Sequence, residues 1–146
     1  MKLYVWGHYH LLKKRKMKNK KFIKNFGLFS VLVGLLYFVV ETWYHFKFGQ
    51  SLIQLIGDYI SIGLLIFAGI IVMKNQNGVG LLCGAWGFTF CINYRAFAWR
   101  MEEIMNHQST TLIDNTTKVL VFCLLYSSIA FIISLILCYP KRINEN

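Results

Sequence analysis

The sequence predicts an all-α integral membrane protein, a four-transmembrane-helix bundle with both termini on the inner side of the membrane (N-in/C-in). Hydrophobic residues make up 56% of its 146 residues, and the mean hydropathy is +0.48. So short a chain has too small a core to bury that much apolar surface in water. The apolar residues also form four blocks, each long enough to cross a hydrocarbon core of about 30 Å, which takes roughly 20 helical residues.

The four blocks predict a single transmembrane domain over 25–140, followed by a cytoplasmic tail over 141–146. Of the 16 Lys and Arg residues, 12 fall on segments that the N-in/C-in orientation places inside, and four on segments that it places outside. Basic residues accumulate on the cytoplasmic side, so their distribution favours this orientation over its inverse. The expected spans, in chain order, are 26–46, 52–73, 78–99 and 119–139.

Residues 1–24 are expected to form a basic cytoplasmic N-terminal segment and are a candidate for disorder. A run of lysines with one arginine precedes the first span. Such a run is typical of a topology signal that also touches anionic lipid, and we favour this interpretation over nucleic acid binding despite the net charge of +10. Residues 1–16 are either disordered or an upstream extension, because Met17 begins a more ordinary N-terminal sequence.

Each span carries a stripe of small or polar residues at steps of three or four, which is the spacing of one helix face. Small residues let membrane helices approach closely, because lipid provides no hydrophobic drive for helix association. We therefore expect the four stripes to face one another inside a compact bundle. They consist of Gly27, Ser30, Gly34, Tyr37, Glu41 and His45; of Gln54, Asp58, Ser61, Leu65 and Ala68; of Gly80, Gly84, Gly87, Cys91, Arg95, Ala98 and Glu102; and of Thr116, Leu120, Cys123, Ser127, Ala130, Ser134 and Cys138.

Three ionisable side chains on these stripes, Glu41, Asp58 and Arg95, are expected at a similar depth in the outer leaflet. An unpaired charge at the centre of a bilayer costs roughly 2.5–3.5 kcal/mol on insertion scales, so such groups are expected to pair. We expect Arg95 to lie between Glu41 and Asp58, and Arg100 to reach the headgroups from the end of its helix. The predicted ligand-binding residues are Glu41, Asp58, Arg95, Gln54, Asn93, Tyr94 and Glu102.

Two interpretations of this cluster remain open: an ion pair that fixes helix register, and a site for a small molecule, ion or proton. Two carboxylates against one arginine leave a surplus acid that can take up a proton, hold a cation or bind a cationic ligand. A metal site is a further alternative, because Glu41 with His45 and Glu103 with His107 are i, i+4 pairs. The four cysteines lack CxxC spacing and are interpreted as small packing residues.

No nucleophile elbow, phosphate-binding loop or cofactor motif occurs in the sequence, which favours a non-enzymatic role. The leading hypothesis is a multi-pass protein of the inner or plasma membrane that binds a small ligand. The alternative is a non-catalytic subunit or assembly factor of a larger membrane complex, with a membrane-protein partner or a second copy of the chain. A membrane enzyme acting on a lipid or quinone is the third hypothesis.

Overall fold

The structure is a computed structural model that describes residues 2–49, 51–106 and 110–139, with their side chains from residue 20 onward except at 112 and 114. This part of the chain contains helices and short connections and no strand. The elements are α1 (Lys2–Phe48), α2 (Leu52–Lys74), the short 3-10 helix η1 (Gln76–Gly78), α3 (Val79–Met105) and α4 (Thr111–Cys138).

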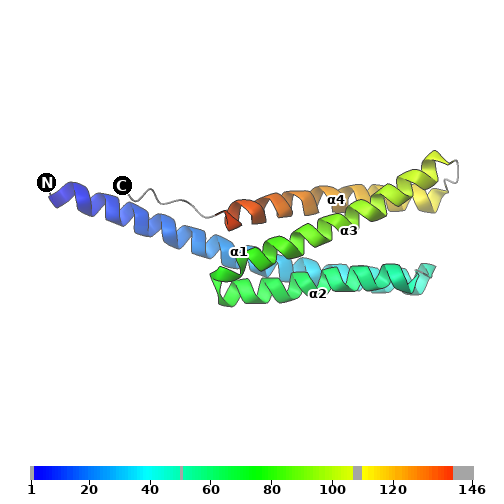
Figure 1. The fold of residues 1–146 in the computed structure, drawn as a ribbon, viewed down its shortest axis with the longest axis horizontal. Helices are drawn as coiled ribbons and strands as arrows, with labels where there is room; N and C mark the ends of the chain where they lie inside the picture. The colour runs from blue at the N-terminus through cyan, green and yellow to red at the C-terminus, as the bar shows by residue number, and fades with distance from the viewer. Residues whose placement is uncertain (1, 50, 107–109, 140–146) are drawn as a thin grey trace.

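The helices form two antiparallel hairpins, α1 with α2 and α3 with α4, which lie against each other along the bundle (Figure 1). The α1–α2 and α3–α4 connections lie at one end, and η1 joins the hairpins at the other. The N-terminal part of α1 extends beyond the other helices at the η1 end. The all-helical bundle is therefore as expected, but α1 is one helix from Lys2, so residue 24 marks no break in secondary structure.

A tight turn fixes the first hairpin. The backbone of Gly49 has a φ of 71°, a conformation that glycine adopts without strain, and its N–H donates to the carbonyl of His45 at 3.0 Å. Ser51 then caps α2, because its hydroxyl accepts a hydrogen bond from the backbone N–H of Gln54 at 3.4 Å. The chain thus ends one helix and begins the next within a few residues, which makes α1 and α2 neighbours.

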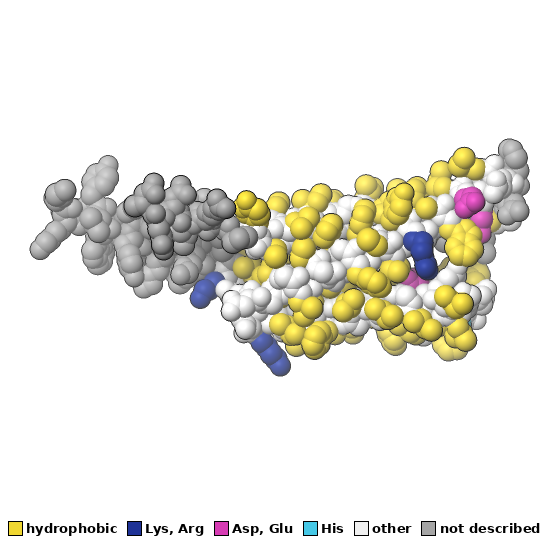
Figure 2. All heavy atoms as spheres, viewed as in Figure 1, with side chains coloured by type: hydrophobic (Ala, Val, Ile, Leu, Met, Phe, Trp, Pro, Cys, Tyr) yellow, Lys and Arg dark blue, Asp and Glu magenta, His cyan; other side chains and the backbone are white. Residues whose placement is uncertain are grey.

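Three segments of the described chain are long and apolar enough to cross a membrane: Lys20–Phe48, Leu52–Lys74 and Asn115–Cys138. Large apolar side chains cover the outside of the bundle; Phe46, for example, is 83% exposed. Figure 2 shows this apolar surface, with Lys and Arg side chains at the η1 end and one more basic side chain toward the other end. Soluble monomers rarely expose apolar surface on this scale, and these features are those of a membrane protein. α3 is not among these three segments.

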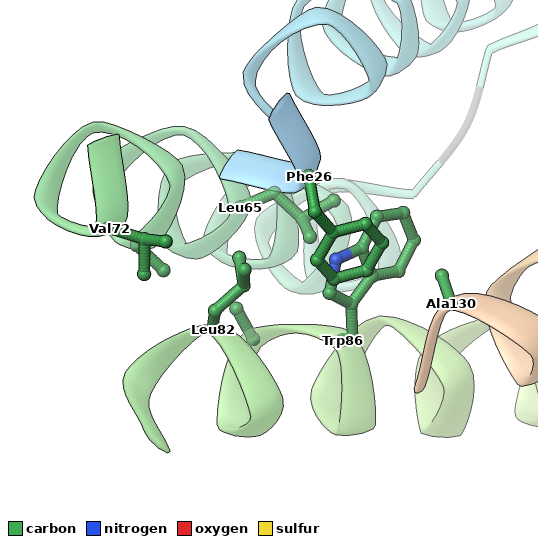
Figure 3. Close-up of a cluster of buried hydrophobic side chains, with 8 residues drawn as sticks. Phe26, Leu65, Val72, Leu82, Trp86 and Ala130 are labelled. Atoms are coloured by element: carbon green, nitrogen blue, oxygen red, sulfur yellow. The ribbon is translucent and has the colours of Figure 1, made fainter. Parts of the chain in front are cut away.

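The buried core draws on all four helices (Figure 3). Trp86 of α3 is at its centre, fully buried, with its ring 6.2 Å from that of Phe26 on α1. Leu65 and Val72 of α2 pack in the same cluster and are also fully buried. A large aromatic side chain therefore fills the space between the hairpins.

α1 and α2 approach closely at two glycines. A Cβ atom added to Gly69 would lie 2.6 Å from the carbonyl oxygen of Gly27, and one added to Gly27 would lie 2.9 Å from that of Gly69. Neither position has space for a side chain, because the obstructing atom is backbone. The contact is a close small-residue approach between membrane helices, made by glycines of two different helices.

The expected inner faces of α1, α2 and α4 are largely correct, but that of α3 is wrong. The stripe residues of α3 are exposed except for Gly87, which is half-buried. The physical reason is the volume of the core: Trp86 fills the space between α1 and α4, and turning it inward rotates the small residues outward. The buried residues of α3 are Val79, Leu82, Ala85, Trp86, Thr89 and Asn93.

Candidate functional site

The most buried acidic side chain of the described chain is Asp58 on α2, which is 8% exposed. The hydroxyl of Tyr37 on α1 donates a hydrogen bond to its Oδ1 at 2.8 Å. Both residues lie on the helix faces that the sequence predicted to point inward. A hydrogen bond to a buried carboxylate is stronger than one between neutral groups, so this contact helps to fix the register of α1 and α2.

Glu41 is the second acid of the site. It follows Tyr37 by four residues on the same face of α1, is half-buried, and interacts electrostatically with Asp58. Tyr37 interacts with both carboxyl groups. Both acids were predicted to face inward; Asp58 is buried and Glu41 is half-buried, without the arginine that was expected between them.

The second hairpin closes the site from the other side. Cys123 of α4 interacts electrostatically with Glu41, and Tyr126 of the same helix interacts with Tyr37. Asn93 of α3 is buried, and its side-chain amide donates to the hydroxyl of Ser127 at 3.3 Å and to the carbonyl of Cys123 at 3.4 Å. All four helices thus contribute polar groups to one level of the bundle.

Two further polar contacts connect this level to the core. The hydroxyls of Ser61 and Thr89 lie 2.7 Å apart and join α2 to α3. The indole N–H of Trp86 donates to the hydroxyl of Ser30 at 2.9 Å and joins α3 to α1. Because every one of these groups is fully buried, each contact satisfies polar atoms that would otherwise be left in an apolar surrounding.

Other predicted ligand-binding residues lie outside this cluster. Arg95, Tyr94 and Glu102 are exposed on α3, and Gln54 is half-buried near the start of α2. Arg95 was expected to be buried between the two acids, and this expectation is wrong because α3 presents its Trp86 face to the bundle. Asn93 is buried as expected, but its hydrogen bonds run to α4.

Arg100, unlike Arg95, has an acidic partner among the described residues. Its Nη1 lies 2.6 Å from Oε2 of Glu103, and its Nη2 donates to the hydroxyl of Tyr44 on α1 at 3.5 Å. The two charged side chains are 30% and 23% exposed. Arg100 was predicted to reach the headgroups, which stays a prediction; in the structure it joins α3 to α1 near the α1–α2 turn, through its contact with Tyr44 and its partly exposed ion pair with Glu103.

His45 extends the α1 stripe one turn beyond Glu41. Its Nδ1 atom is buried and has no hydrogen-bond partner in the structure. No group of three or more His, Cys, Asp or Glu side chains among the described residues could hold a metal ion. Of the other metal candidates, Glu103 pairs with Arg100 and His107 lies outside the described residues.

Tyr37, Cys123 and Tyr126 were not predicted as site residues, although Tyr37 and Cys123 belong to stripes that were predicted to face inward. The signal for Tyr37 was its i, i+4 spacing to Glu41, which puts phenol and carboxyl on one face. No comparable signal exists for Tyr126, whose place depends on how α4 packs against α1. In comparisons with known proteins, no family model, curated protein or solved structure matched this chain.

Proposed function

We propose that this chain is a multi-pass membrane protein that binds a proton or a small cationic ligand at the acid pair formed by Glu41 and Asp58. The observation that supports the proposal is the hydrogen bond from Tyr37 of α1 to the buried Asp58 of α2, with half-buried Glu41 one turn from Tyr37 on the same face of α1. Two interacting carboxyl groups inside an apolar bundle do not both stay ionised on their own: one takes up a proton, or a bound cation offsets their charge.

The neighbours of the acid pair fit this role. Tyr37 donates to Asp58 and orients one carboxyl group. His45 lies one turn from Glu41 on the same face of α1, and its buried Nδ1 atom has no hydrogen-bond partner in the structure, which leaves it available to a bound ligand. Ionisable residues within membrane helices are rare and mark ion, proton or ligand sites more often than other residues do.

The proposed location is the inner or plasma membrane, with four crossings and the N-in/C-in orientation. Four lysines support it, because they are exposed at the η1 end of the bundle and would face the cytoplasm and anionic lipid headgroups. In this arrangement the acid pair lies in the outer leaflet, nearer the α1–α2 turn. The four lysines are Lys20, Lys21, Lys24 and Lys74.

Infrared difference spectroscopy of the full-length protein in lipid nanodiscs tests the proposal. We expect a protonated-carboxyl band at neutral pH that decreases when Na⁺ or tetramethylammonium is added, if these cations displace the proton. The Glu41→Gln and Asp58→Asn variants should each lack this response. The cation that is effective distinguishes a metal-ion site from a site for an organic cation, and a band insensitive to both indicates a proton site.

Glu102→Gln is the matched control, because Glu102 is an exposed acid on α3, outside the cluster. It should leave the band and its cation response unchanged. The proposal is overturned if the native protein shows neither a protonated-carboxyl band nor a cation-dependent change, or if both acid variants keep the native response.

A further inference from the structure

One face of α3 carries small and charged residues on the outside of the bundle, and we name it the α3 stripe. Its members are exposed and separated by steps of three, four or seven residues, so they share one side of the helix. In a membrane this side faces lipid. The members of the α3 stripe are Gly80, Gly84, Cys91, Arg95, Ala98 and Glu102.

The glycines of the α3 stripe are not needed by the fold of this chain. A Cβ atom added to Gly84 would meet nothing within 4 Å, and one added to Gly80 would meet only Sγ of Cys138 at 3.9 Å. Gly27 and Gly69 differ, because backbone of the neighbouring helix excludes a side chain at each of them. Gly80 and Gly84 therefore leave a shallow surface where a further helix can approach α3 closely.

Arg95 lies on the same stripe and is exposed. The hydrogen bonds and ion pairs found among the described residues do not include it. The Cα–Cβ bonds of a helix tilt toward its N-terminus, so the Arg95 side chain starts out directed away from the nearer end of α3. This direction makes it harder for the guanidinium group to reach the nearest headgroups. A guanidinium group that stays in hydrocarbon requires an anionic partner.

We propose that the α3 stripe docks a transmembrane helix of another protein that carries a carboxylate at the depth of Arg95. The glycines would allow close packing, and the carboxylate would form a charge-assisted pair with the guanidinium. The lower hydropathy of α3, compared with the three helices that qualify as spans, is expected of a helix that a partner shields from lipid. This inference does not depend on the binding of a ligand at Glu41 and Asp58.

Charge decides between a partner helix and a second copy of this chain. Copies that insert in the same orientation, related by an axis normal to the membrane, would bring Arg95 to the same depth as the partner copy's Arg95. Glu102 lies two helical turns away, about 10 Å along the axis, and is a poor partner in such a pair. A like-charge contact is unfavourable, so the surface fits a helix with an acidic residue.

Energy transfer between the labelled full-length protein and synthetic membrane-spanning peptides in vesicles tests the docking. One leucine-rich peptide carries a single glutamate at the depth of Arg95, and the matched peptide carries glutamine there. We expect the glutamate peptide to bind about tenfold more tightly, a difference of about 1.4 kcal/mol. The Arg95→Gln variant should remove this preference, and Gly84→Leu should weaken the binding of both peptides.

Gly63→Leu is the matched control for Gly84→Leu. Gly63 is an exposed glycine of α2 where an added Cβ also meets nothing within 4 Å, so the same substitution there should leave peptide binding unchanged. Equal affinity of the native protein for the two peptides would overturn the proposal, as would an unchanged preference in Arg95→Gln. Self-association of the native protein that Gly84→Leu abolishes would also overturn it, in favour of a second copy as the occupant.

Discussion

The indole N–H of Trp86 donates to the hydroxyl of Ser30 at 2.9 Å and joins α3 to α1 across 56 residues of sequence. Both side chains are fully buried, and Ser30 in turn donates to the carbonyl of Phe26 at 2.9 Å. The bond requires the Trp86 face of α3 to point into the bundle. It thereby determines which residues of α3 lie outside, including Gly84 and Arg95.

A double-mutant cycle with Trp86→Phe and Ser30→Ala should show favourable coupling between the two residues. Hydrogen bonds between membrane helices are worth about 0.6 kcal/mol on average, with a maximum of roughly 1.7 kcal/mol, and we expect a value in this range. Unfolding free energies of the four proteins in detergent or bicelles provide the measurement. Additive effects of the two substitutions would mean that the bond does not contribute to stability.

Gly69→Ala and Gly63→Ala should change stability in opposite directions. At Gly69 the added Cβ meets the carbonyl oxygen of Gly27, so the helices must separate, at a cost of about 1–3 kcal/mol. At Gly63 the added Cβ meets nothing, and alanine is the better helix former by about 0.5–1 kcal/mol. Unfolding measurements on both variants check the contrast, and a shift of the same sign for both would contradict it.

Tyr37→Phe should cost more stability than Tyr59→Phe. The Tyr37 hydroxyl donates to the buried Asp58, and its loss leaves a carboxyl group with one donor fewer, at a cost of about 1–3 kcal/mol. The Tyr59 hydroxyl lies 3.1 Å from that of Thr42 on an exposed part of the surface, so its loss should change stability by less than about 0.5 kcal/mol. Thermal unfolding in nanodiscs gives both values, and equal effects would argue against a structural role for the Tyr37 bond.

Glu103→Gln should reduce stability by no more than about 1 kcal/mol, because its pair with Arg100 is partly exposed to solvent. The effect should also decrease as salt is added, since the Debye length falls from about 10 Å at 0.1 M to about 3 Å at 1 M. Unfolding at the two salt concentrations measures it. A large effect that salt does not change would contradict this prediction and would mean that the pair is shielded from water.

Much of the helix orientation could be predicted from the sequence. The spacing of Asp58, Ser61 and Leu65 marked the inner face of α2, and all three residues are buried. Ser127 and Ser134 did the same for α4. In these helices the stripe positions are mostly small or polar and most other positions are large and apolar, so the periodicity favours one face.

The orientation of α3 could not be predicted in the same way, because two faces of this helix have regular spacing. Gly80, Gly84 and Cys91 repeat on one side, and Leu82, Trp86 and Thr89 on another. The choice depends on the space that Phe26 and Ser30 leave for an indole ring, and these residues lie far away in the sequence. Small residues show where a helix can approach, but not whether that helix belongs to the same chain.

Because the orientation of α3 could not be predicted, only part of the candidate site could be. Glu41 and Asp58 lie on helices whose inner faces were predicted correctly, so neither of them is exposed. Arg95 was predicted as a site residue because the small-residue face of α3 was expected to point inward. In the structure that face points outward, so Arg95 is exposed. Tyr126 was not assigned at all, because its place near the site depends on how the α3–α4 hairpin packs against the first hairpin.

The two hairpins contribute unequally to the acid site. Tyr37, Glu41 and Asp58 all belong to the first hairpin, which the Gly49 turn closes at one end and the Gly27–Gly69 approach holds toward the other. The distance between the two acids is therefore set by the packing of α1 against α2. The α3–α4 hairpin is held against the first hairpin at η1, at the Trp86–Ser30 and Ser61–Thr89 contacts and, toward the α1–α2 turn, at the Arg100–Tyr44 contact. The acids are thus placed by one hairpin, and the second hairpin determines what covers them.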